Sequence, residues 1–287
     1  MKYAWMKEHR GKYSIAAMSR CFNVVPQGFY QWLKKKTNDE SEKVFIAEIE
    51  DVMRETRHTY GSKRVAKELK ERGFCINHKK VARIRDENNI RCKRVKKRKK
   101  TTDSSHEFPA SENRLNRCFK VNCPNRAWVG DITYLKYKEG WMYLCIWLDL
   151  YSRKIVGWSV SKSLASGFVC SALESALERR PGARPLIHSD RGVQYASNDF
   201  RRMLWQNKLR QSMSRKGDCW DNSVAESFFG TLKSELVFDT TLSEADVRSM
   251  IFDYIEVFYN RKRLHSTLGF KSPENFESQY WSLEVAL

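Results

Sequence analysis

The sequence predicts a two-part protein, in which an all-α part is followed by an α/β domain. Its 287 residues correspond to about two domains of ordinary size. Positive charge is concentrated in the first 120 residues. From residue 126 onward, helical spacing of apolar residues gives way to runs of β-branched and aromatic residues, which are typical of strands.

The charge of the chain is unevenly distributed. Lys and Arg number 53 against 34 Asp and Glu, which gives a formal net charge of +19. Residues 1–120 hold 31 basic and 15 acidic side chains, whereas residues 121–287 hold 22 and 19. Such an excess favours a polyanionic partner for the first part. With 41% hydrophobic and 30% charged residues, the composition excludes collagen-like, low-complexity and wholly disordered chains.

Helices account for the first part. Residues 14–33 indicate a helix, a turn and a second helix opened by Pro26, the pattern of a helix-turn-helix. After a charged break, residues 41–57 predict an amphipathic helix, and residues 62–72 and 77–88 predict a second helix-turn-helix. We expect the last helix to present basic side chains to DNA, although a solvated helix would have the same pattern. These side chains are Lys79, Lys80, Arg83 and Arg85.

A dense run of positive charge follows. Residues 91–100 contain eight basic side chains and no acidic one. Such a run binds phosphates with an affinity that falls steeply with salt, although a solvated linker would have the same composition. The candidate DNA contacts in it are Lys96, Lys97, Arg98, Lys99 and Lys100. Residues 101–120 then predict an exposed connection between domains.

Strands begin the second part. Residues 128–137, 141–150 and 154–160 predict three successive antiparallel strands. Further elements are a helix at 166–179, a strand at 185–189, and helices at 198–206 and 222–236. This order predicts a mixed sheet covered by helices.

The cysteines and the apolar stretches of the sequence indicate where in the cell the protein is located. The eight cysteines include no Cys-x-x-Cys pair, which predicts a reduced cytosolic chain. Cys118 and Cys123 have no neighbouring His cluster or second Cys pair to complete a zinc site. The longest apolar stretch, residues 141–148, is too short to cross a bilayer, so we expect a cytoplasmic protein without a membrane partner.

Three acidic residues lie where an acid needs an explanation. Asp131 lies inside the first strand, where a carboxylate is costly unless it is paired or binds a metal. Asp190 follows the fourth strand, at the kind of strand end where α/β proteins place ligand groups. Glu226 lies on the helix at 222–236. Because residues 223–226 also match a capping box, both roles stay open for Glu226.

These residue types favour Mg²⁺ or Mn²⁺ over zinc, because the carboxylates come without a Cys/His cluster. Two such ions can activate an attacking oxygen and stabilise a leaving one in phosphoryl transfer. Lys233 lies two helical turns after Glu226, ~10 Å along the same face, where its cation could hold a phosphate. Arg215 and Lys216 precede this helix and are further candidate DNA contacts, with a solvated loop as the alternative.

The sequence around these acids resembles a known family. The intervals are 58 residues between Asp131 and Asp190 and 35 between Asp190 and Glu226. The local motifs are Trp-Val-Gly-Asp-Ile-Thr-Tyr at 128–134, His-Ser-Asp-Arg-Gly-Val-Gln-Tyr at 188–195, Asp-Cys-Trp-Asp-Asn at 218–222, Glu-Ser-Phe-Phe at 226–229 and Tyr-Asn-Arg-Lys-Arg-Leu-His-Ser-Thr-Leu at 259–268. Together they resemble the DDE pattern of retroviral integrases and insertion-sequence transposases. The resemblance is closest to the second-frame protein (OrfB) of the insertion-sequence-three family, over residues 5–277.

The resemblance implies an RNase H-like catalytic core, with Asp131, Asp190 and Glu226 as catalytic residues and ligands of two Mg²⁺ or Mn²⁺ ions. It implies a DDE transposase that nicks a strand at an element end and uses the freed 3′-OH to attack DNA, without a covalent protein intermediate. Arg263 and His265, in the last motif, are further candidate DNA contacts. The expected partners are double-stranded DNA, as terminal repeats and target, and further copies of the chain, because two ends must meet. The expected location is the bacterial cytoplasm, at the nucleoid.

The expected division is a helix-turn-helix-like segment at 1–38, a second helix-turn-helix domain with its basic tail at 39–100, a linker at 101–120, the catalytic core at 121–240 and a C-terminal helix and tail at 241–287. Family members usually act fused to a first-frame protein (OrfA) that carries a coiled coil. This sequence has no sustained heptad run, so OrfA is a candidate partner.

Two alternative functions stay open at this stage. One is a DNA-binding regulatory subunit that needs OrfA for activity. The other is a tyrosine recombinase that uses Tyr259, Arg263 and His265, which would leave Asp131 unexplained. For His188 we expect packing rather than catalysis.

Overall fold

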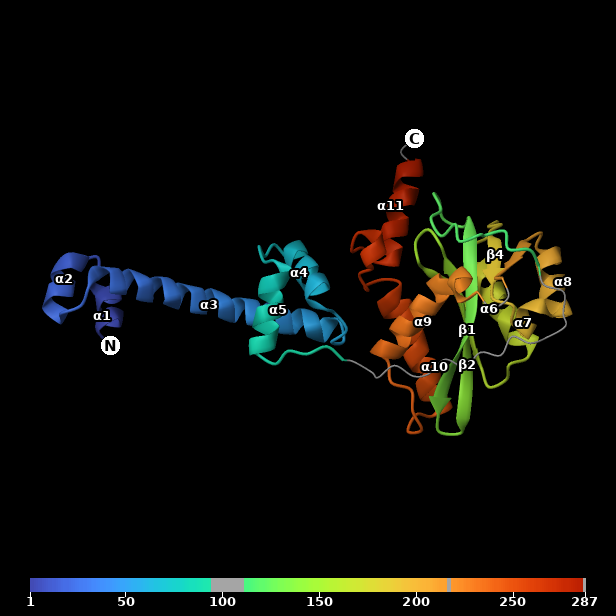
Figure 1. Ribbon diagram of the computed structural model, residues 1–287, viewed down its shortest axis with the longest axis horizontal. Coiled ribbons are helices and arrows are strands. Elements are labelled where there is room, and N and C mark those ends of the chain that lie inside the picture. Colours follow the sequence, from blue (N-terminus) through green and yellow to red (C-terminus); the bar gives the residue numbers. More distant parts are fainter. Residues whose placement is uncertain (94–110, 216–217, 286–287) are drawn as a thin grey trace. The chain divides into compact units, whose positions relative to one another are not determined.

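Helices alone build the first 92 residues, and a sheet with its covering helices builds the rest (Figure 1). The computed structural model describes residues 1–93, 111–215 and 218–285. The expected all-α part followed by a mixed α/β domain is confirmed.

The first unit contains five helices within its described residues. They are α1 (Lys2–His9), α2 (Ile15–Phe22), α3 (Pro26–Glu55), α4 (Ser62–Glu71) and α5 (His78–Glu87). The Ser14 hydroxyl caps α2 by accepting from the Ala17 amide, and Asn23 ends α2 in the left-handed conformation, with φ 52°. Met6, Met18 and Phe29 form a small buried cluster between α1, α2 and the start of α3.

The charged break expected before residue 41 is wrong, because α3 runs through it without interruption. The boundary expected at residues 38 and 39 therefore falls inside a helix. No Gly or Pro lies between Gly28 and Gly61, and Lys and Glu are good helix formers. The second half of α3 packs against α4 and α5 through buried apolar side chains. These are Ile49, Val52, Met53, Val65, Leu69, Val81 and Ile84.

The second unit is built on a five-stranded sheet with the order β3-β2-β1-β4-β5. Its strands are β1 (Ala127–Tyr137), β2 (Gly140–Asp149), β3 (Ile155–Ser161), β4 (Leu186–Ser189) and β5 (Arg210–Met213). The first three are antiparallel neighbours, and β4 and β5 continue the sheet in parallel with β1. The mixed sheet expected from the sequence is therefore confirmed.

Helices cover both faces of this sheet (Figure 1). One face carries α6 (Ser166–Arg179), α7 (Val193–Ala196) and α8 (Asn198–Gln206), and the other carries α9 (Ser223–Glu235) and α10 (Glu244–Phe252). Two glycines allow close packing. A Cβ at Gly157 would lie 2.3 Å from the Ala172 carbonyl oxygen on α6, and one at Gly130 would lie 2.4 Å from the Trp147 ring. Gly130 directly precedes Asp131, so the strand is closely packed where it presents that acid.

The C-terminal part has more elements than the single helix expected at 241–287. After α10 come a π-helical segment (Asp253–Tyr259), a 3₁₀ turn (Ser266–Leu268) and α11 (Pro273–Val285). A buried ion pair, Arg263 with Glu235 (2.6 Å), joins the segment after the π-helix to the end of α9.

The linker expected at 101–120 is wrong for its second half, while residues 101–110 lie outside the described residues. The Ser212 hydroxyl on β5 accepts from the amides of Arg114 (2.9 Å) and Leu115 (3.1 Å), and Leu115 is buried. Ser111 Oγ also donates to Gln211 Oε1 (2.7 Å). Residues 111–117 therefore pack on the edge strand of the sheet.

None of the helices in the described ranges is long and apolar enough to cross a membrane.

Candidate active site

Asp131 lies on β1, and Asp190 directly follows β4, the parallel neighbour of β1. β1 and β4 pair in parallel, and the last registered pair is Val129 with His188. Asp131 and Asp190 each lie two residues beyond this pair, so both acids lie just past the same end of the β1–β4 ladder. The backbones of adjacent strands are about 4.8 Å apart.

The carboxylates of Asp131 and Asp190 both affect the protonation of one buried pair of side chains. Cys145 on β2 and Tyr195 on α7 are buried, with Sγ and Oη 3.8 Å apart. Burial raises the pKa of both groups, and the negative charges of Asp131 and Asp190 raise it further. The Asp190 side chain also accepts from the Gly192 amide (2.9 Å), which fixes the loop after β4. These shared electrostatic effects agree with the strand register.

Glu226 lies in the first turn of α9, which is attached to the strand that carries Asp131. The helix starts at Ser223, with Asn222 as its N-cap, and the Asn222 side chain donates to the Gly130 carbonyl (3.2 Å). Glu226 follows Asn222 by one turn, on the same side of the helix. The capping box considered for residues 223–226 is absent, because Ser223 lies inside the helix and not at its N-cap.

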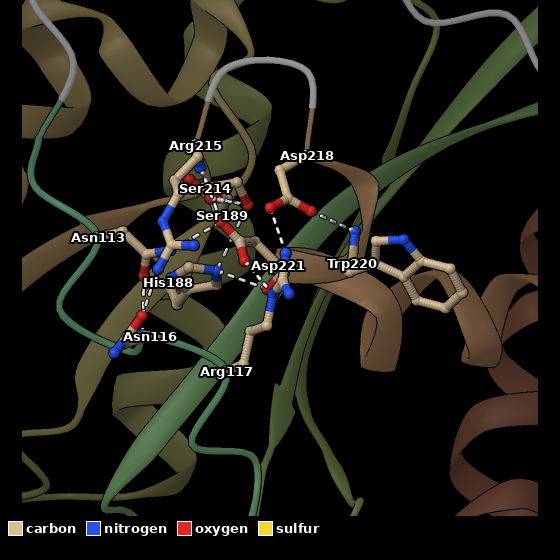
Figure 2. A network of polar contacts seen from close by, with 10 residues as sticks. All are labelled: Asn113, Asn116, Arg117, His188, Ser189, Ser214, Arg215, Asp218, Trp220 and Asp221. Carbon is tan, nitrogen blue, oxygen red and sulfur yellow. Dashed lines mark hydrogen bonds and ion pairs between the residues drawn. The ribbon is translucent and has the colours of Figure 1, made fainter.

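A buried carboxylate holds the turn before α9 (Figure 2). Asp221 is fully buried, and its oxygens accept from Asn113 Nδ2 (2.8 Å), Arg117 Nε (2.8 Å) and the Arg215 amide (2.9 Å). Burial acts to raise the pKa of Asp221, but the Arg215 amide and the Arg117 guanidinium together hold it below its usual value. Asp221 is therefore ionised, and it joins the segment before β1 to the turn before α9.

His188 joins the same turn to β4. Its Nε2 lies 3.0 Å from the Asp221 carbonyl oxygen and its Nδ1 lies 2.9 Å from Ser212 Oγ. A carbonyl oxygen only accepts, so Nε2 carries the proton and Nδ1 accepts from the Ser212 hydroxyl. Burial lowers the pKa of His188, which keeps the imidazole neutral. His188 therefore has a structural role two residues before Asp190, as expected from the sequence.

The turn at residues 219–222 thus contacts β1, which carries Asp131, and β4, which directly precedes Asp190, and it leads into the helix that carries Glu226. The sequence patterns singled out these three acids but gave no role to Asp221 and Asn222. The motif Asp-Cys-Trp-Asp-Asn was a usable signal, because two acids and an amide directly before a helix suggest a fixed turn.

The three acids offer the donor chemistry of a Mg²⁺ or Mn²⁺ site, namely carboxylates without thiolate or imidazole. In the part of the chain that the structure describes, no three His, Cys, Asp or Glu side chains are gathered as a ready-made metal cluster. The residue types and the shared strand end fit such an ion, while the full set of ligands is not assembled around one point.

The four candidate DNA contacts on α5 differ in their exposure and in their partners. Lys79 is exposed, and the Lys80 ammonium lies 4.3 Å from the centre of the Phe45 ring. Arg83 pairs with Glu42 (2.8 Å) and Glu87 (2.7 Å), so its charge is already balanced within the protein. The outward position expected for Arg85 is wrong. Arg85 is buried, and it donates to the carbonyls of Tyr60 and Ile90.

Two candidate residues of the motif at 259–268 are buried as well. The DNA contact expected for Arg263 is wrong, because its guanidinium is buried against Glu235. Tyr259 is only 2% exposed, which argues against a tyrosine nucleophile. His265 is half-buried, and its Nδ1 lies 2.8 Å from the Thr267 hydroxyl.

The remaining candidates stay predictions. Arg215 is exposed, and its guanidinium donates to Asn116. Lys233 is half-buried in the last turn of α9. The other candidates lie outside the described residues: Lys96, Lys97, Arg98, Lys99, Lys100 and Lys216.

Comparison with known proteins identifies the family. Models described as an integrase core domain match residues 121–219 and 207–273, and one described as an HTH-like domain matches residues 39–98. The chain is 39% identical over 285 residues to the transposase InsF for insertion sequence IS3A of Escherichia coli strain K12, covering 97% of this chain and 99% of that protein. The chain belongs to the IS3-family transposases.

Further relatives include the 31 kDa protein of insertion element IS600 from Shigella sonnei, with 40% identity over 267 residues, 92% of this chain and 98% of that protein. Among solved structures, the HTLV-2 integrase catalytic core domain in complex with magnesium matches at 19% identity with a TM-score of 0.40, over 54% of this chain and 97% of that one. By the family models that it matches, this IS3-family transposase combines an HTH-like region with an integrase-type core.

Proposed function

We propose that this transposase cleaves DNA strands at the ends of its insertion element and joins the freed 3′ ends to target DNA. One observation supports the proposal: Asp131 and Asp190 each follow the last registered pair of β1 and β4 by two residues, and the bond from Asn222 to the Gly130 carbonyl attaches the helix of Glu226 to β1. These acids would hold two Mg²⁺ or Mn²⁺ ions. Such ions activate an attacking oxygen and stabilise a leaving one.

The reaction proceeds in two displacements at phosphorus. In the first, a water oxygen bonds to phosphorus, the bond from phosphorus to O3′ breaks, and a 3′-OH is released. In the second, this 3′ oxygen bonds to a phosphorus of the target strand and displaces an O3′ there. Lys233, two turns beyond Glu226 on α9, holds a neighbouring phosphate. Arg215 holds another at the loop before α9.

The expected partners are DNA, which the basic charge of the chain attracts, and further copies of the chain, because the element has two ends. The HTH-like region and the basic run of residues 91–100 hold the terminal repeats and target by their phosphates. Because two ends take part in one event, at least two copies of the chain act together on DNA. A first-frame OrfA protein is a candidate partner in recognising those ends.

The test uses duplex DNA with the element's terminal sequence, pre-cut to end in a labelled 3′-OH, and an unlabelled target plasmid. With Mg²⁺ we expect the label to join the plasmid. A matched duplex that ends in a dideoxynucleotide should give no joined product, and neither should a reaction with chelator. Joining of the dideoxy end, or a covalent protein–DNA product, would refute the proposal in favour of a different chemistry.

A further inference from the structure

Trp220 is a large apolar side chain left in solvent next to the candidate active site. It lies in the turn before α9 and is 68% exposed, whereas Trp128 and Trp147 in the sheet are fully buried. An exposed indole offers a large, rigid apolar face that a planar ligand can cover. Figure 2 shows its indole directed away from the polar network of the same turn.

The backbone that carries this indole is fixed on both sides. The Trp220 amide donates to Asp218 Oδ1 (3.1 Å), and Arg117 forms ion pairs with both Asp218 and Asp221. Asn222, two residues on, is bonded to the Gly130 carbonyl. The ring therefore stands exposed on a turn that has little freedom left, which reduces the entropy lost when a ligand covers it.

The surroundings of Trp220 suit a nucleic acid. Arg215, five residues before Trp220, is exposed and donates to the neutral Asn116, and its charge also acts on the buried Asp221 carboxylate. Trp220 also precedes Glu226 by six residues, and its turn contacts the strand that carries Asp131. Exposed aromatic side chains bind unpaired bases by stacking, in grooves where cations contact the phosphates.

We propose that Trp220 is a stacking platform for a nucleobase that leaves the duplex at the DNA end held by the three acids. This inference rests on the proposed function, because it takes the DNA end to be the substrate of that site. Presenting a phosphodiester to acids at a sheet end requires local distortion of the duplex, and a base that leaves the stack loses stacking energy. The Trp220 indole replaces the lost stacking.

The test measures base stacking separately from cleavage. Terminal duplexes carry 2-aminopurine, whose fluorescence is quenched by stacking, at each of the last three positions in turn. They are bound by the Glu226→Gln chain, with or without Trp220→Ala or Trp220→Phe. Trp205→Ala is the matched control, because Trp205 is 80% exposed but lies on α8, on the other face of the sheet.

2-Aminopurine is already quenched by its neighbours in the free duplex, so the complexes are compared with one another. At one terminal position we expect the quenching to persist with the Glu226→Gln chain, to weaken with Trp220→Phe, and to be lost with Trp220→Ala, where the base has left the stack without a new partner. In the chain with Glu226 intact, Trp220→Ala should lower nicking at limiting DNA about tenfold, and terminal mismatches should recover part of the loss. Trp205→Ala should change neither quantity.

Equal quenching by the Trp220→Ala and Trp205→Ala chains would overturn the proposal, as would absence of quenching at all positions. A change in the oligomeric state of Trp220→Ala without a change in quenching would instead assign the indole to a protein contact. Because quenching needs no cleavage, a failure of the proposed chemistry would leave this result interpretable.

Discussion

At the scale of single residues, two buried polar groups decide the local geometry. Asp221 is an ionised carboxylate without solvent contact, which is tolerated because three donors satisfy it, including a guanidinium. His188 remains neutral, because its Nε2–H donates to the Asp221 carbonyl and its Nδ1 accepts from Ser212. A second proton on Nδ1 would remove the Ser212 bond and place an unsolvated charge beside the site.

We expect His188 to contribute to the pH dependence of the free energy of unfolding. Its pKa is lowered in the folded chain from an unfolded value of 6.5, so the unfolded chain binds the proton more readily. Its contribution to stability is therefore complete above pH 6.5 and is lost as the pH falls toward the folded pKa, by at most about 1.4 kcal/mol per pH unit. Urea unfolding at pH 8.0, 6.5 and 5.5 should show a smaller slope with pH for His188→Gln than for the wild type. Equal slopes would contradict this role.

At the scale of elements, the turn at residues 219–222 and α9 act together. The turn is bonded to β4 through the Asp221 carbonyl and to β1 through the Asn222 side chain, so the helix that carries Glu226 starts from a fixed point. The other end of α9 is fixed by the buried pair of Glu235 with Arg263.

Asn222→Ala should separate catalysis from stability. One lost hydrogen bond costs about 1 kcal/mol of unfolding free energy, whereas a displacement of Glu226 by about 1 Å lowers the nicking rate at saturating DNA roughly 100-fold. The control is Asn207→Ala, which removes a side-chain bond to the Met203 carbonyl of α8 at an exposed position far from Glu226 in the sequence. The control should keep its rate. An Asn222→Ala chain with the wild-type rate would show that this bond does not position the acid.

At the scale of the whole molecule, local patterns predicted the sheet and the three acids, while contacts between distant segments were not predictable. The strands follow from runs of apolar and β-branched residues, but β5 is short and has the polar sequence Arg-Gln-Ser-Met, so no pattern located it. Asn222 bonds to a residue 92 positions away, and Asn113 bonds to Asp221 across 108 positions. Arg263 was expected on DNA because nothing in its neighbourhood shows that Glu235 pairs with it inside the fold.

We propose above that Asp131, Asp190 and Glu226 act as one metal-binding set. The most direct measurement is the rate of nicking of end-labelled terminal DNA against Mg²⁺ concentration, with DNA binding measured in parallel. The chains compared are the wild type, Asp131→Asn, Asp190→Asn and Glu226→Gln. We predict that each substitution lowers the rate roughly a thousandfold or more while affinity for DNA changes less than about twofold, and that chelator abolishes wild-type nicking. Near-wild-type nicking by any of the three variants, or nicking that survives chelator, would contradict the account.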